Sequence, residues 1–334
     1  MNMLPVILYL NTVFGLTIAD IFGPFTDNFM RHMARKPKRN EYMLKQIEKY
    51  GDSGCFGGKV TSEEQLSNNP VIFIHGNSDS ALKFGESPYQ SGWNRHLETF
   101  VGHGFSMSEM YGLTYGNRNI STSYLQEFNC ADVIGHRRFL EEVLLYTRSK
   151  KVSIIAHSMG VTIARAIIQG GKIELNGETC VLGKSMAHHI SVFVGIAGAN
   201  YGMCACEFAS AFPACGKERG FYPGAFQQMP NETCKSLPLK DCPTCGDVNY
   251  GTFLQSLNRI EHREADTVVS IWSEEDEVIG LKNMAWGVKT SLIPHSTVQK
   301  VYQKLSHTEL KTETSKDVLQ ILKQHTKHHI STHL

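Results

Sequence analysis

The most informative segment of this chain reads Lys151-Val-Ser-Ile-Ile-Ala-His-Ser-Met-Gly160 and continues as Val161-Thr-Ile-Ala-Arg-Ala-Ile-Ile168. The apolar run from Val152 to Ile155 is typical of a buried parallel strand, and Ser158 falls where that strand must turn into a helix. Small residues around this serine, Ala156 and Gly160, would let helix and strand approach closely. The alternative is an ordinary serine at a helix N-terminus. The flanking patterns favour a nucleophile elbow, with Ser158 as the nucleophile.

Strands and helices alternate along the rest of the chain. Strands are predicted at 71–74, near 108–115 as an edge-like strand, at 190–196, at 267–272 and near 298–302. Helices are predicted at 40–50, 93–101, 130–147, 250–260 and 315–323. This order predicts an α/β protein with a mostly parallel central sheet covered by helices. We expect an N-terminal extension at 20–54 and one catalytic domain at 55–330.

The charge balance narrows the range of partners. Lysine and arginine number 33, aspartate and glutamate 32. Such a balance argues against a nucleic-acid-binding surface or a strongly anionic partner. The histidines of the C-terminal tail (His325, His328, His329 and His333) have no spacing that would fix a metal ion. We therefore expect neither a metal nor a cofactor.

The N-terminal residues 1–19 are uncharged, mostly apolar and end in small residues. This pattern resembles a secretory signal cleaved near Ala19, although a basic leading region is missing. A membrane anchor is the alternative, but Asn11 interrupts the run and Asp20 closes it near the minimum length for a membrane span. No later segment is apolar enough to cross a bilayer, so we expect a secreted, extracellular protein.

The chain has nine cysteines, which in a secreted protein indicate disulfides. Six crowd into one stretch (Cys204, Cys206, Cys215, Cys234, Cys242 and Cys245), and three lie outside it (Cys55, Cys130 and Cys180). No pairing follows from the sequence, and the odd count leaves at least one thiol free or paired outside the chain. The pair Cys242 and Cys245 could instead bind zinc or act as a redox dithiol, but a zinc site would need two further ligands.

Two sequons, Asn119-Ile-Ser121 and Asn231-Glu-Thr233, are candidate glycosylation sites. They matter only for a chain that enters the secretory route, with which they are consistent.

A nucleophilic serine needs a histidine base and an acid that orients it, and in elbow-type hydrolases these follow in the order serine, acid, histidine. The strand ending at Trp272 leads into Ser273-Glu-Glu-Asp-Glu-Val-Ile-Gly280. We favour Asp276 as the acid because Val278 and Ile279 would anchor the loop in the core. Its neighbours Glu274, Glu275 and Glu277 are the alternatives, expected to be solvated.

His307 stands late in the chain, just before the last predicted helix, where the base is expected. His295 is the competitor, but it precedes a strand instead of the terminal helix. His157 adjoins Ser158, and adjacent strand residues point in opposite directions, so we expect it to pack behind the site.

Acyl transfer also requires backbone donors for the oxyanion, one after the nucleophile and one after an early strand. Met159 supplies the first. His75-Gly76-Asn77 follows the strand at 71–74, and the amide of Asn77 is the expected second donor.

Together, Ala156-His-Ser-Met-Gly160, His75-Gly76, Gly195-Ile-Ala-Gly-Ala-Asn200, the loop at 271–280 and His307 resemble the class 2 triacylglycerol lipases. These are α/β-hydrolases known as small secreted bacterial lipases and, with added cysteines, as a secreted group in nematodes. The resemblance runs from about residue 55 to 325. It implies an α/β-hydrolase fold, a triad of Ser158, Asp276 and His307, oxyanion donors at Asn77 and Met159, and a lipid or ester substrate, with a lipid–water interface as a further partner.

Residues 201–248 depart from the small bacterial members, so their route of substrate access does not carry over. We expect this cysteine-rich insertion to cap the acyl-binding face, because its aromatic residues (Phe208, Phe212, Phe221, Tyr222 and Phe226) would otherwise lack a packing partner. A stabilising appendage far from the site is the alternative. Two other functions remain open: hydrolysis of a different ester, thioester or peptide, and a non-catalytic binding protein of the same fold.

Overall fold

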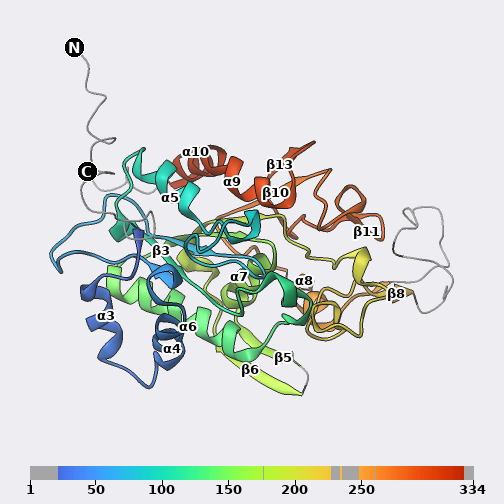
Figure 1. Ribbon diagram of the computed structural model, residues 1–334, viewed down its shortest axis with the longest axis horizontal. Coiled ribbons are helices and arrows are strands. Elements are labelled where there is room, and N and C mark those ends of the chain that lie inside the picture. Colours follow the sequence, from blue (N-terminus) through green and yellow to red (C-terminus); the bar gives the residue numbers. More distant parts are fainter. Residues whose placement is uncertain (1–21, 176, 227–233, 235–247, 260, 327–334) are drawn as a thin grey trace, which may run out of the picture.

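Parallel strands form the central sheet of this computed structural model (Figure 1). In the part of the chain described, the order is β1 (Cys55–Phe56), β3 (Met110–Leu113), β2 (Val71–Ile74), β4 (Val152–His157), β7 (Ile190–Ile196), β10 (Thr267–Ser273) and β13 (Val298–Tyr302). All neighbouring pairs are parallel except β1 with β3, which is antiparallel. The predicted alternation of strands and helices is confirmed. The strand predicted as edge-like, β3, lies inside the sheet, because β1 covers its outer side.

The structure describes residues 22–326 apart from 176, 227–233, 235–247 and 260. The predicted signal peptide at 1–19, the sequon at Asn231, the cysteines Cys242 and Cys245 and the tail histidines His328, His329 and His333 lie outside the described residues. Among the residues described, no helix is both long enough and apolar enough to cross a membrane.

Helices cover both faces of the sheet. Side chains alternate between the faces of a strand, so Phe73 and Ile155 pack with α5 (Asn94–Val101) and α10 (Ser315–Thr326). Ile72 and Ile154 point to the opposite face, where α6 (Cys130–Thr147) and α7 (Met159–Gln169) cover them. Figure 1 shows α5, α9 (His307–Glu313) and α10 on one side of the sheet and α6 on the other. The inner strands β2, β4, β7 and β10 are thus buried on both faces, as their mostly apolar sequences predict, whereas the edge strand β13 is only partly buried.

The residues before β1 join the same hydrophobic core. Here α3 (Asp27–Ala34), α4 (Glu41–Tyr50) and the 3-10 helix η2 (Gly51–Gly54) precede the first strand. Phe29 and Met33 on α3 are fully buried. Arg39 donates to Glu142 on α6 over 3.0 Å. The segment therefore packs onto the helical layer instead of extending into solvent.

A hairpin that the sequence pattern did not predict follows α7. It consists of β5 (Gly171–Leu175) and β6 (Glu178–Gly183), and Cys180 on β6 forms a disulfide with Cys130 on α6. Its alternating exposed and buried residues give it one solvated face. Smaller elements, mostly near the sheet edge that carries the site, are η3 (Pro88–Gln90), η4 (Met107–Glu109), η5 (Ile120–Leu125), η6 (Ala187–His189), η10 (Leu281–Asn283), β11 (Met284–Ala285) and β12 (Val288–Lys289).

The described part of the cysteine-rich insertion has little regular structure. It contains η7 (Cys204–Cys206), η8 (Pro213–Cys215), β8 (Ala225–Phe226) and β9 (Val248–Asn249), followed by α8 (Thr252–Asn258). Disulfides join Cys204 to Cys234 and Cys206 to Cys215. Phe221 packs edge-on against Phe128, with ring centroids 5.1 Å apart, and the insertion is thereby attached to the segment before α6.

The prediction of Cys55 as a disulfide cysteine is wrong. Cys55 lies in β1, fully buried, and is a free thiol. Burial raises the pKa of this thiol to about 12, because a thiolate would lose its hydration there. Cys55 therefore acts as a small apolar core residue.

Candidate active site

Ser158 occupies a strained turn between β4 and α7. Its backbone has φ 53° and ψ −125°, a conformation that non-glycine residues rarely adopt. The following helix passes so close to β2 that a Cβ on Gly160 would lie 2.4 Å from the carbonyl oxygen of His75. Only glycine fits at this position, so the predicted elbow is present and holds Ser158 at the C-terminal edge of the sheet.

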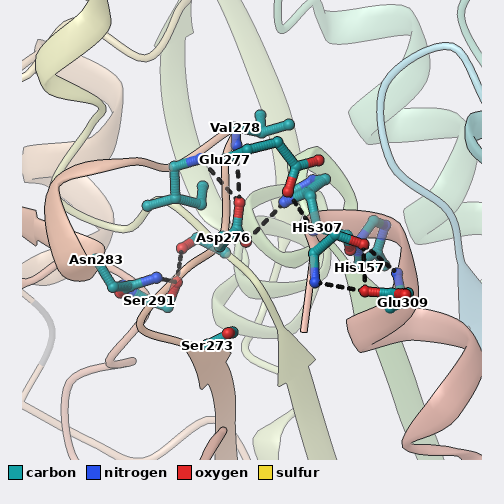
Figure 2. Close-up of polar contacts among 12 residues, drawn as sticks. His157, Ser273, Asp276, Glu277, Val278, Asn283, Ser291, His307 and Glu309 are labelled. Carbon is teal, nitrogen blue, oxygen red and sulfur yellow. Dashed lines mark hydrogen bonds and ion pairs between the residues drawn. The ribbon is translucent and has the colours of Figure 1, made fainter. Parts of the chain in front are cut away.

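Asp276 lies in the turn that follows β10, and both oxygens of its carboxylate accept hydrogen bonds (Figure 2). Oδ1 accepts hydrogen bonds from the backbone amides of Val278 (3.0 Å) and Ile279 (2.9 Å). Oδ2 accepts from Nδ1 of His307 over 2.8 Å. The side chain of Ile279 is buried in the core, as expected for an anchor of this loop. The turn therefore presents one carboxylate oxygen to the imidazole and fixes the other.

His307 is the first residue of α9. Ser306 caps the helix, and Glu309 closes a reciprocal capping box with it, which fixes where the helix begins. Because Nδ1 donates to Asp276, Nε2 of the neutral imidazole is left as the acceptor. This is the tautomer that a general base for a serine hydroxyl requires.

Two of the carboxylates beside Asp276 make contacts that the sequence did not predict. Glu277 is exposed, as predicted, and also accepts the backbone N–H of His307 over 2.9 Å and the hydroxyl of Tyr89 over 3.1 Å. Glu274 pairs with Lys289 over 2.8 Å. Glu275 is exposed, as predicted. Glu277 thus holds the backbone of His307, and Asp276 orients the imidazole of the same residue.

His157 packs behind His307, with ring centroids 4.7 Å apart. Its Nε2 lies 3.0 Å from the carbonyl oxygen of His307. Burial, with a smaller contribution from the neighbouring His307, lowers the pKa of His157 well below its ordinary value, so the ring is neutral. A neutral ring with the proton on Nε2 donates to that carbonyl and helps to fix the start of α9.

A cavity of about 340 Å³ opens at this edge of the sheet. It is lined by Gly76, Asn77, Ser78, Asp79, Tyr89, Ile120, Ser123, His157, Ser158, Val278, His307, Thr308 and Lys311. The cavity brings Ser158 and His307 together, although they lie 149 positions apart in the sequence. His295 does not line it and lies exposed between β12 and β13.

The two expected oxyanion donors flank the elbow. Met159 is the first residue of α7, a position whose backbone N–H has no partner within the helix. Asn77 lines the cavity, and its side chain donates to the carbonyl oxygen of Ser123 over 2.9 Å. The loop between β2 and Asn77 is held by His75, whose carbonyl accepts the hydroxyl of Tyr115 over 2.9 Å. Asn77 and Met159 thus remain the expected donors to an oxyanion at Ser158.

A buried ion pair in this cavity is not apparent from the sequence. Asp79, three residues after Gly76, pairs with Lys311, one turn after His307 on α9. The two residues are 232 positions apart, so no local pattern connects them. Only the packing of α9 against the loop after β2 brings them together.

A parallel sheet with helices on both faces and a strained serine after a central strand defines an α/β-hydrolase. Within that class, the family model for class 2 lipases matches residues 68–320, and the chain belongs to this family. It is therefore a lipolytic ester hydrolase, as the resemblance implied.

Several solved structures are similar to the chain at low identity. A monoacylglycerol lipase of Paleococcus ferrophilus is 13% identical, with 77% of this chain and 96% of that chain covered and a TM-score of 0.43. A structure from work on carboxylesterases of Nitrososphaera gargenis is 15% identical, with 82% and 94% covered and a TM-score of 0.43. A metagenome-derived lipolytic enzyme is 16% identical, with 82% and 98% covered and a TM-score of 0.46.

Proposed function

We propose that the protein is a secreted serine hydrolase that cleaves acyl esters of glycerol lipids through an acyl-enzyme on Ser158. The observation that carries the proposal is the shared cavity of Ser158 and His307, with the imidazole oriented by Asp276 over 2.8 Å. The class 2 lipase family supports a lipid ester as substrate. Disulfides among the described cysteines support secretion.

In the proposed reaction, Nε2 of His307 takes the hydroxyl proton as Oγ of Ser158 attacks the ester carbonyl carbon. The backbone amides of Asn77 and Met159 donate to the oxyanion of the tetrahedral intermediate. The C–O bond to the alcohol then breaks, and the imidazolium returns its proton to the leaving alkoxide. Water, deprotonated by His307, attacks the acyl-enzyme in the same way and releases the carboxylic acid and Ser158.

Hydrolysis of p-nitrophenyl butyrate by the wild type and by Ser158→Ala tests this proposal. Loss of the nucleophile of such a triad costs on the order of 10⁶ in kcat. Ser62→Ala, at an exposed position outside the cavity, is the matched control and should retain wild-type rates. A fluorophosphonate probe should label the peptide that contains residue 158 in the wild type and in Ser62→Ala but not in Ser158→Ala. Equal turnover by Ser158→Ala would refute the mechanism, and a folded wild type without any turnover would favour the binding-protein alternative.

A further inference from the structure

We propose that the side chain of Asn77 is a positioning group for the oxyanion site. It ties the loop after β2, which carries the expected backbone donor, to η5, which forms another part of the cavity wall. The inference rests on the proposed function and deepens it, because it states how the donor amide is held in place. The side chain of Asn77 thereby has a role distinct from that of its backbone.

The loop after β2 lies directly against the nucleophile. A Cβ on Gly76 would lie only 2.9 Å from Cβ of Ser158, and Asn77 is the next residue of the loop. Asn77 and Ser158 line the same cavity. Because an oxyanion donor must lie within about 3 Å of the charge that it stabilises, a small shift of this loop would weaken the donor.

The peptide before Asn77 is fixed by His75. Nε2 of this imidazole accepts the backbone N–H of Tyr115 over 3.1 Å, so Nδ1 has the proton and donates to the carbonyl oxygen of Gly76 over 2.7 Å. Burial lowers the pKa of His75 to about 3, so the ring is neutral. The carbonyl and the N–H of a trans peptide point in opposite directions. The N–H of Asn77 is therefore turned away from the His75 ring.

The side chain of Asn77 fixes the same residue from its other side. Nδ2 donates to the carbonyl oxygen of Ser123 over 2.9 Å, and Oδ1 accepts the hydroxyl of Ser78 over 2.9 Å. Ser78 is buried and has φ 60°, in the left-handed region that residues other than glycine rarely adopt. Its hydroxyl also lies 3.3 Å from the carbonyl oxygen of Asn119, which precedes η5. Both ends of the Asn77 amide are thus bonded.

Secondary contacts hold η5 on both sides of the bond from Asn77. Before Ser123, Oγ1 of Thr122 accepts Nδ2 of Asn117 over 3.0 Å. After it, Tyr124 packs edge-on against Phe212 of the insertion, with ring centroids 5.4 Å apart. The carbonyl of Ser123 is therefore a fixed partner, and the loop after β2 cannot shift without breaking the bond to it.

The first test is Asn77→Ala, which retains the backbone amide and removes both side-chain bonds. For p-nitrophenyl butyrate we expect kcat to fall about 10- to 100-fold with little change in KM, because a displacement of about 1 Å in a reacting site can cost 10²-fold. Asn68→Ala is the matched control. Asn68 is also partly buried, donates to Glu109 over 2.9 Å and does not line the cavity, so wild-type kcat is expected. Wild-type kcat in a folded Asn77→Ala would overturn the inference.

The second test separates positioning of the oxyanion donor from a general loosening of the protein. An alkyl trifluoromethyl ketone accepts Oγ of Ser158 at its carbonyl carbon while the hydroxyl proton passes to Nε2 of His307, and the hemiketal oxygen becomes the oxyanion. In Asn77→Ala its Ki should rise by the factor by which kcat/KM falls, as for a transition-state analogue. The Ki of the unfluorinated ketone, a ground-state analogue, should stay constant. An unchanged Ki for the trifluoromethyl ketone beside a lowered kcat would overturn the inference.

Asn77→Asp preserves the shape of the side chain, should Asn77→Ala fail to fold. It retains an acceptor for Ser78 but places an oxygen against the carbonyl of Ser123, so kcat and the Ki of the trifluoromethyl ketone should change at least as much as in Asn77→Ala. Ser78→Ala leaves the bond to Ser123 and should cost less. Wild-type values of both quantities in Asn77→Asp would overturn the inference, whereas a folded wild type without turnover or trifluoromethyl ketone inhibition would count against the proposed function itself.

Discussion

Oδ2 of Asp276, in the turn after β10, accepts a hydrogen bond over 2.8 Å from Nδ1 of His307, which begins α9 and lies 31 positions later in the sequence. The contact follows from the sheet. Strands β10 and β13 are parallel neighbours, so the turn after β10 and the segment after β13 emerge at the same edge. Ser273, the last residue of β10, is paired in register with Tyr302, the last of β13. The acid and the imidazole are thus positioned by strand pairing instead of by a local motif.

Replacing Asp276 by asparagine should lower kcat by about 10⁴, because the amide would favour the wrong imidazole tautomer without changing the shape of the turn. Steady-state hydrolysis of p-nitrophenyl butyrate measures the loss. Glu275→Gln, at the exposed neighbouring carboxylate, is the matched control and should stay near the wild type. If Glu275→Gln proved the more damaging of the two, the assignment of the acid would be wrong.

Glu277 should act as a positioning residue for the imidazole. Its carboxylate accepts the backbone N–H of His307, so Glu277→Ala frees the start of α9, and we expect kcat to fall roughly 10- to 100-fold with a smaller change in KM. Tyr89→Phe removes only the hydroxyl that bonds to Glu277 and should cost less. Equal losses in both variants would assign the effect to the Tyr89 contact instead of to His307.

The sequence predicted the parts of the site that have local patterns. A strand, a sharp turn and small neighbours indicated Ser158, and the position after a strand indicated Asp276. The partners that hold these residues were missed where the contact is long-range: Glu277 looks like one of several loop charges, and its bond to His307 appears only once the strands are paired. The ion pair of Asp79 and Lys311 was missed for the same reason, because its two residues are far apart in the sequence.

Local pattern also explains which elements were predicted. The strand at 71–74 and the helix at 130–147 have strong apolar runs or stripes, and the structure has them at these residues. The hairpin of β5 and β6 was missed because only alternate residues are buried and the strands are short. Helix α9 was not predicted either. It has only 7 residues, and they do not show the repeating apolar pattern of a longer amphipathic helix.

Gly160→Ala should destabilise the protein and abolish most activity. The added methyl group would meet the carbonyl oxygens of Ile74 and His75 at 2.5 and 2.4 Å, and backbone atoms cannot move aside as a flexible side chain can. We expect a loss of roughly 1–3 kcal/mol in the free energy of unfolding. Gly102→Ala is the control, because its backbone is right-handed helical at φ −60° and the nearest contact is 3.2 Å away. Comparable losses from both changes would contradict the close approach of α7 to β2.

His96 should make stability depend on pH. Burial, aided by the charge of Lys311, lowers the pKa of His96 to about 3, whereas an imidazole in the unfolded chain titrates near ~6.5. Between these two pH values the unfolded chain binds more protons than the folded protein does. The contribution of His96 to the free energy of unfolding is therefore largest above pH ~6.5 and decreases as the pH drops towards 3.

His96→Leu removes this contribution and should reduce the slope of unfolding free energy against pH by up to about 1.4 kcal/mol per unit in that window. Urea unfolding at a series of pH values measures the slope. His188→Gln, at an exposed position, is the control. The same slope in the wild type and in His96→Leu would show that His96 does not remain neutral in the folded protein.

The cysteine-rich insertion should contact the lipid surface. Phe208 is 83% exposed and Phe212 50%, in the loop around the Cys206–Cys215 disulfide. Phe212 packs edge-on against Tyr124 of η5 at 5.4 Å, and η5 also carries Ile120 and Ser123 of the cavity lining. None of the residues of the insertion that the structure describes (201–226, 234 and 248) lines the cavity itself. The loop therefore lies beside the mouth, where exposed aromatic rings can enter a lipid–water interface.

Phe208→Ser/Phe212→Ser should lower hydrolysis of emulsified tributyrin several-fold and weaken binding of the Ser158→Ala protein to vesicles, since burial of each large side chain in lipid stabilises the bound state. Hydrolysis of dissolved p-nitrophenyl butyrate should change much less, because the reaction site is intact. Val60→Ser replaces a residue that is 80% exposed and does not line the cavity, and it controls for the loss of surface hydrophobicity. Equal losses on the emulsion and on the dissolved ester would indicate a disturbed cavity instead of a lipid-binding loop.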